Sequence, residues 1–188
     1  IQYYTGFYTS NDGYQFLMNT TKGKKEQIPL NVFMGVDPAS SENIKADYTA
    51  IVIIGVDADF NIYVLDLFRG QVAPFDCAEK IFEMALQYRP KLLNLEETGH
   101  FMLRDYIMKK SKESGYFLNI IPKKAIKTKY YRIKQMQPYF ASKAVFLKEE
   151  HYELEQELMQ FREHGTFKKD TLDALRWSLD DVYKPDIE

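Results

Sequence analysis

The chain has 188 residues, of which 45% are hydrophobic and 28% are charged, and its formal net charge is −2. This length and balance predict one globular domain with a substantial core. No apolar run approaches the roughly 18 residues of a membrane-spanning helix. A single cysteine, Cys77, excludes an internal disulfide and fits a reducing compartment. With only three histidines beside it, the chain also lacks a zinc-finger pattern.

Residues 1–30 are rich in Tyr, Thr, Asn, Lys and Gly and have little apolar periodicity. We expect them to form an extended arm or linker that enters a single domain over residues 31–188. The N-terminus has no basic segment followed by an apolar one, so we expect no signal peptide. The sequence begins at Ile1 rather than at a methionine. We also expect the chain to be a fragment of a longer protein.

The apolar patterns predict alternating strands and helices along the rest of the chain. Expected strands cover 32–37, 49–56, 62–68, 92–96, 117–121 and 145–147, and the second and third are joined by a turn at 57–61. Expected helices cover 74–88, 100–112, 126–139, 152–161 and 170–183. A hairpin followed by strand–helix–strand units predicts a mixed central sheet with helices on both faces.

Acidic residues follow two of these strands directly. Asp37 ends the first apolar strand and Glu96 ends the run Leu92-Leu93-Asn94-Leu95. In such sheets ligands bind at the carboxyl ends of strands, so the two acids lie together if the strands are parallel neighbours. The alternative is structural: Asp before Pro starts turns, and an acid such as Glu96 or Glu97 favours the start of a helix.

A second acidic group opens the last helix. Asp170 and Asp173 lie one turn apart and share a helix face, although the same pair also resembles a capping arrangement. Asp47, which precedes the second strand, is a possible auxiliary acid, or else an ordinary loop residue. If Asp37, Glu96 and Asp170 converge, a hard cation such as Mg²⁺ or Mn²⁺ is the natural partner for their oxygens.

The net charge hides a basic segment. Residues 122–148 hold eight basic residues and no acid, which leaves 17 basic against 27 acidic residues elsewhere. Such a segment fits a protein that meets a polyanion on one face, although a charge run is also typical of a solvated helix.

The ordered motifs resemble the C-terminal nuclease domain of the large terminase subunit of tailed bacteriophages, over roughly residues 30–183. The resemblance rests on GVDPA at 35–39, DYT at 47–49, LEETG at 95–99, KYYRI at 129–133, QPYF at 137–140, VFL at 145–147, LMQF at 158–161 and KDTLDAL at 169–175. Relatives often have two acids before the last helix, where this chain has Lys169 and Asp170. The third metal ligand is therefore Asp170 or, as the alternative, Asp173.

The resemblance implies an RNase H/RuvC-like fold and an endonuclease that cleaves double-stranded viral DNA with low sequence specificity during genome packaging. Asp37, Glu96 and Asp170 would hold two Mg²⁺ or Mn²⁺ ions for phosphodiester hydrolysis. Lys127, Lys129, Arg132 and Lys134 are the expected phosphate contacts.

The chain contains no G-x-x-x-x-G-K-[ST] loop, so the ATPase domain of a terminase is expected to precede residues 1–30 in the longer protein. The resemblance also implies the small terminase subunit and the portal protein as partners, and the host cell cytoplasm as location. Two alternatives stay open: another RNase H-like nuclease of the resolvase or transposase kind, and a non-catalytic DNA-docking module whose acids are caps and turns.

Overall fold

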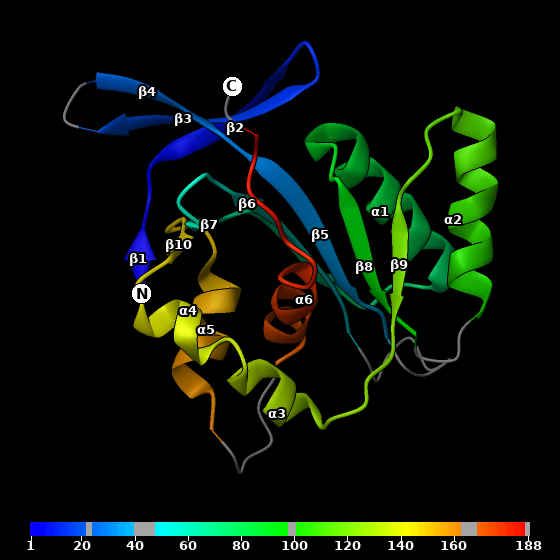
Figure 1. Cartoon of the computed structure of the whole chain (residues 1–188). Coiled ribbons are helices and arrows are strands. Elements are labelled where there is room, and N and C mark those ends of the chain that lie inside the picture. Colours follow the sequence, from blue (N-terminus) through cyan, green and yellow to red (C-terminus); the bar gives the residue numbers. More distant parts are fainter. Residues whose placement is uncertain (22–23, 40–47, 98–100, 163–168, 187–188) are drawn as a thin grey trace.

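The computed structural model describes residues 1–21, 24–39, 48–97, 101–162 and 169–186. Its centre is a seven-stranded mixed sheet in the order β1-β10-β7-β6-β5-β8-β9 (Figure 1). The strands are β1 (Gln2–Tyr3), β5 (Asn31–Asp37), β6 (Thr49–Val56), β7 (Ile62–Gly70), β8 (Leu92–Glu96), β9 (Ile120–Lys123) and β10 (Val145–Leu147). A mixed sheet of this kind is what the sequence predicts.

The apolar composition of the two central strands, β5 and β6, accounts for their burial. All residues of β5 and β6 are buried, because both strands are apolar on both faces and are covered on both. β6 and β7 form the expected antiparallel hairpin, whereas β5 and β8 are parallel, with Val36 opposite Leu95. That register places Asp37 beside Glu96 at one edge of the sheet, as the sequence predicts.

Helices cover both faces of the sheet. α1 (Pro74–Tyr88) and α2 (Phe101–Ser114) pack on one face, and α3 (Lys129–Lys134), α4 (Gln137–Ala141), α5 (Tyr152–Gln160) and α6 (Asp170–Ser178) pack on the other. The two faces have separate apolar clusters, because side chains alternate along the strands between them. In the part of the chain described, no helix is both long enough and apolar enough to cross a membrane.

Several element boundaries differ from the expected ones. The helix expected over residues 126–139 is two short helices, α3 and α4, and Pro138 lies in the first turn of the second. A proline is accepted there because its missing N–H has no partner in a first turn. α6 ends at Ser178 rather than at residue 183, although Leu179 stays buried against the same cluster. β9 begins at Ile120 rather than at residue 117.

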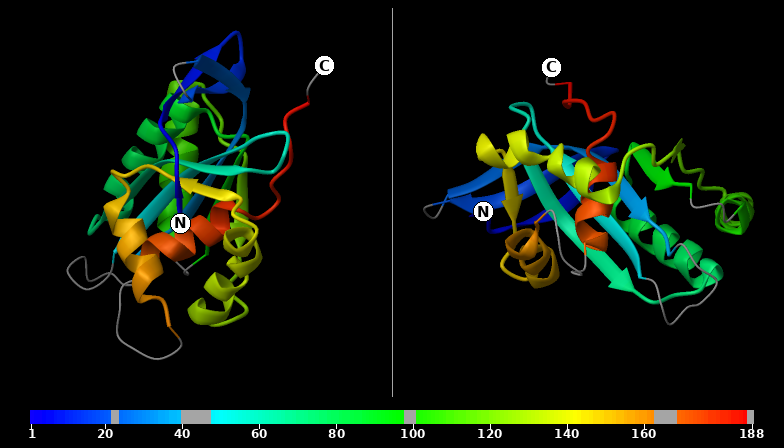
Figure 2. Two further views of the ribbon diagram at one scale, coloured as in Figure 1. Left: turned by 90° about the vertical axis from the view of Figure 1, so that its left-hand side faces the viewer. Right: turned by 90° about the horizontal axis from the view of Figure 1, so that it is seen from below.

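Residues 1–30 form more structure than their composition indicates. β1 pairs with β10 in the main sheet, and β2 (Gly6–Asn11), β3 (Tyr14–Thr21) and β4 (Lys24–Pro29) form a separate antiparallel sheet. Leu17 of this small sheet is fully buried in the main core. The small sheet lies at the end of the molecule opposite α3 (Figures 1 and 2). That residues 1–30 connect this domain to an ATPase domain stays a prediction.

Gly35 allows α6 to approach β5 more closely than any other residue would. A Cβ built on Gly35 would lie 2.1 Å from the carbonyl oxygen of Ala174 and 2.3 Å from the amide nitrogen of Ser178. Both atoms belong to the backbone of α6, so neither can rotate away. The glycine thus sets the depth at which α6, with its two acids, lies on the sheet.

We expect Gly35→Ala to lower the free energy of unfolding by about 1–3 kcal/mol, since overpacking forces backbone shifts. Chemical denaturation measures this change. Gly55→Ala is the matched control on the neighbouring strand, because its Cβ would meet chiefly the flexible side chain of Leu30. A loss at Gly35 no larger than that at Gly55 would contradict the role of the close approach.

Candidate metal centre

Two neighbouring strand ends supply the first two acids of the site. Asp37 ends β5 and Glu96 ends β8, and the two residues are only 6% and 9% exposed. Burying two like charges side by side is unfavourable unless cations compensate them. The arrangement therefore requires positive charge nearby, from the protein or from a bound ion.

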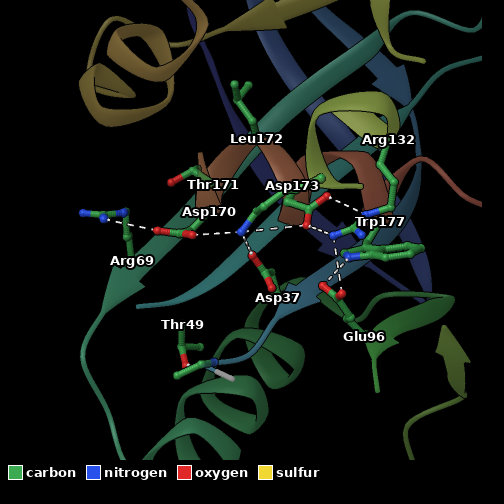
Figure 3. A network of polar contacts seen from close by, with 12 residues as sticks. Asp37, Thr49, Arg69, Glu96, Arg132, Asp170, Thr171, Leu172, Asp173 and Trp177 are labelled. Carbon is green, nitrogen blue, oxygen red and sulfur yellow. Dashed lines mark hydrogen bonds and ion pairs between the residues drawn. The ribbon is translucent and has the colours of Figure 1, made fainter. Parts of the chain in front are cut away.

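The third acid comes from the helix that packs on Gly35. Asp173, in the first turn of α6, is fully buried, and one carboxylate oxygen from each of Asp37, Glu96 and Asp173 lies within 4.8 Å of the others (Figure 3). Three elements far apart in sequence thus deliver three carboxylates to one point. Within the described residues, this is the acidic group whose spacing suits a metal ion.

Asp170 lies beside this group rather than in it. Its carboxylate accepts a hydrogen bond from Lys129 Nζ at 2.9 Å and pairs with the Arg69 guanidinium at 3.3 Å. The geometry therefore favours the alternative, Asp173, over Asp170 as the third ligand. Asp47, the possible auxiliary acid, lies outside the described residues.

Two cations of α3 reach into the acidic group. Lys129 Nζ lies 2.7 Å from Asp37 Oδ2 and 3.8 Å from Asp173 Oδ2. Arg132 pairs with Asp173, lies 3.4 Å from Glu96 Oε1, and stands over the ring of Trp177 (Figure 3). Two of the four expected phosphate contacts therefore neutralise the buried acids.

Burial dominates the protonation of the site. It raises the pKa of Asp37 well above its usual range, although the Lys129 ammonium opposes the rise, and it raises the pKa of Asp173 against the opposing effect of Arg132. Burial alone would lower the pKa of Lys129, but the carboxylates of Asp37 and its neighbours raise it instead. The ammonium therefore stays charged, and the two carboxyl groups hold protons more readily than free ones do.

Side chains that the sequence analysis did not identify orient this group. Trp177 Nε1 donates a hydrogen bond of 3.0 Å to Glu96 Oε2. Asn94 Nδ2 donates to the carbonyl oxygens of Trp177 and Asp180, each at 2.9 Å, and so ties the end of α6 to β8. A sequence signal existed for Asn94, because it interrupts the leucines of β8 with a polar side chain.

The donor set fits a hard divalent cation. Carboxylate oxygens are the ligands that Mg²⁺ and Mn²⁺ prefer, and Asp37, Glu96 and Asp173 supply them from rigid elements. Trp177 on Glu96 provides the outer hydrogen bond that usually fixes a ligating carboxylate.

The other two expected phosphate contacts lie on the surface. Lys127 and Lys134 are exposed and line an open hollow of about 700 Å³ beside α3 and α4. Its other lining residues are Tyr131, Gln135, Gln137, Pro138 and Ala141. This surface continues outward from the helix that carries Lys129 and Arg132.

The chain resembles known proteins in fold. It matches a structure of the large terminase nuclease from thermophilic phage G20c with 12% identity, 96% of this chain and 95% of that chain covered, and a TM-score of 0.64. A structure of that nuclease with bound magnesium matches at 13% identity, 95% and 93% coverage, and a TM-score of 0.61. The large terminase of bacteriophage HK97 matches at 14% identity over 80% of this chain and 39% of that chain, with a TM-score of 0.58.

A search of curated proteins finds no relative by sequence. The family model described as the terminase RNase H-like domain, however, matches residues 34–181, which include all the acids described above. The fold is thus RNase H-like, as the motifs indicate, and the chain belongs to the terminase RNase H-like domain family.

Proposed function

We propose that the chain is a metal-dependent endonuclease that cleaves double-stranded viral DNA during genome packaging. The observation that carries this proposal is the convergence of Asp37, Glu96 and Asp173, with oxygens within 4.8 Å, in a domain of the terminase family. The magnesium found in the G20c nuclease supports the same type of site. Turns and helix caps do not require carboxylates from three separate elements to meet at one point, whereas a metal ion does.

Asp37, Glu96 and Asp173 would hold Mg²⁺ or Mn²⁺, and Asp170, which lies beside them, is a further acid that could hold a second ion. When bound, a pair of such ions would supply an activated water and would stabilise the charge of the leaving 3′ oxygen. Lys129 and Arg132, which pair with these carboxylates in the structure, are the cations placed to donate to phosphate oxygens of the substrate. Trp177 keeps Glu96 oriented through its indole N–H.

The DNA would lie along α3 and the hollow beside it. Lys127 and Lys134 offer exposed charges to the backbone, and Tyr131 and Gln135 offer further polar contacts. Phosphate contacts carry little sequence information, so this surface supports cleavage with low sequence specificity.

A role in genome packaging would involve further partners. Residues 1–30 would join this domain to the terminase ATPase domain, and the small terminase subunit and the portal protein would position it on the genome in the host cell cytoplasm. The small sheet lies at the end of the molecule opposite α3, which leaves the proposed DNA surface accessible (Figure 1).

We expect the protein to nick or linearise supercoiled plasmid with Mn²⁺ or Mg²⁺ but not with EDTA. Asp37→Asn should lose about 10²–10³-fold in rate, which corresponds to the several kcal/mol that a bound metal supplies. Gel analysis of plasmid cleavage measures the effect.

Asp105→Asn is the matched control. This exposed acid lies on α2, which packs on the face of the sheet opposite to α3 and α6. Cleavage by Asp37→Asn at the wild-type rate would reject the metal centre. Metal-independent DNA binding without cleavage would favour the docking-module alternative.

The third ligand can be identified by comparing Asp173→Asn with Asp170→Asn. We expect at least about tenfold weaker Mn²⁺ binding for Asp173→Asn, because the variant lacks one of the three carboxylate ligands; tenfold corresponds to about 1.4 kcal/mol. Calorimetric titration of each folded variant measures the affinity. A larger loss for Asp170→Asn would return the ligand role to Asp170.

Replacing Lys127 and Lys134 together with Ala should weaken DNA binding and flatten its salt dependence. Each lost phosphate contact reduces the slope of log K against log salt by about 0.9, so the double variant should lose about 1.8. Fluorescence anisotropy with a DNA duplex measures this slope. Lys109→Ala with Lys112→Ala, two exposed charges on α2, is the matched control; equal slopes for the two double variants would exclude the α3 surface.

A further inference from the structure

The helix that carries Asp173 does not cap its own N-terminus. Lys169 precedes α6 and provides no side-chain cap hydrogen bond. The first backbone N–H groups of a helix need acceptors from elsewhere, and they are costly when buried without one. Thr171 and Leu172 are both fully buried, so the cap of α6 must come from another part of the fold.

Glu157 of α5 provides this cap from outside the helix. Its Oε2 accepts the Leu172 N–H at 2.9 Å, and its Oε1 faces the Thr171 N–H at 3.4 Å. Glu157 is only 5% exposed, although it is a charged residue on a helix whose neighbouring acid Glu153 is exposed. An anion at this point also interacts favourably with the helix dipole.

Arg69, at the end of β7, connects this cap to the acids. Its Nε lies 3.6 Å from Glu157 Oε1, an ion-pair contact, and its guanidinium reaches Asp170 Oδ2 at 3.3 Å (Figure 3). The guanidinium also stacks 3.7 Å from the ring centroid of Tyr48. The Arg69 side chain is 8% exposed, so its position is fixed by these partners.

We propose that Glu157 and Arg69 are positioning residues that set the metal-binding geometry of the first turn of α6. Glu157 fixes the backbone of that turn and Arg69 fixes the carboxylate of Asp170. Asp173 follows in the same turn, so its direction toward Asp37 depends on both. Neither residue belongs to the acidic group itself. The inference rests on the proposed metal centre. It adds that two residues outside the centre, one on α5 and one on β7, hold the first turn of α6 in place.

The test is the affinity of the whole chain for Mn²⁺, measured by calorimetry in wild type, Glu157→Ala, Glu157→Gln and Arg69→Met. Loss of outer contacts to metal-site residues typically weakens affinity by about 10–100-fold, and we expect this for Glu157→Ala and Arg69→Met. Glu157→Gln keeps an acceptor oxygen for Leu172 N–H and should recover part of the loss. Glu153→Ala, an exposed change on the same helix, should bind as wild type.

Thermal unfolding in EDTA separates positioning from stability. Variants that unfold at lower temperature but bind Mn²⁺ with wild-type affinity would overturn the inference, because Glu157 and Arg69 would then be purely structural. If Glu157→Ala does not fold, Glu157→Gln and Arg69→Met decide the question in the same way. Absence of Mn²⁺ binding and of cleavage in wild type would instead overturn the proposed function, so the two failures are distinct.

Discussion

The concentration of negative charge beneath α3 is the constraint on which the rest of the structure depends. Asp37, Glu96 and Asp173 are all nearly inaccessible to solvent, and carboxylates in such surroundings repel one another strongly. Lys129 and Arg132 balance them from a single short helix. α3 is thus held against the sheet by ion pairs as well as by its apolar residues, and the same charges define where a cation or a phosphate can bind.

The geometry of the acids follows from packing rather than from their own contacts. The parallel register of β5 and β8 fixes the first two acids relative to each other. Gly35 lets α6 lie directly on β5, and Asn94 ties the far end of that helix to β8. Glu157 holds the near end. A helix fixed at both ends and in depth has little freedom to rotate, which is what a site with ligands on three elements requires.

The sequence was sufficient for the parts of the site that depend on local pattern. Apolar strands that end in acids predicted the neighbouring positions of Asp37 and Glu96. The choice between Asp170 and Asp173 depends on how α6 is rotated about its axis, which the long-range contact at Gly35 sets. The role of Arg69 could not be predicted either, because its two acidic partners, Glu157 and Asp170, lie about 90 or more residues away along the chain. Residues 1–30 show the same limit, since their strands pair through contacts that weak periodicity does not reveal.

The basic segment divides into two parts that composition alone could not separate. Lys129 and Arg132 point from α3 into the acids, whereas Lys127 and Lys134 stay exposed at the two ends of the same short stretch. On the proposed function, a duplex backbone that binds the exposed lysines must therefore run past Lys129 and Arg132. Binding along α3 would bring a phosphate to the acidic group by the course of the helix itself, without any base contact. The same binding surface along α3 would then both place the phosphate at the acidic group and account for low sequence specificity.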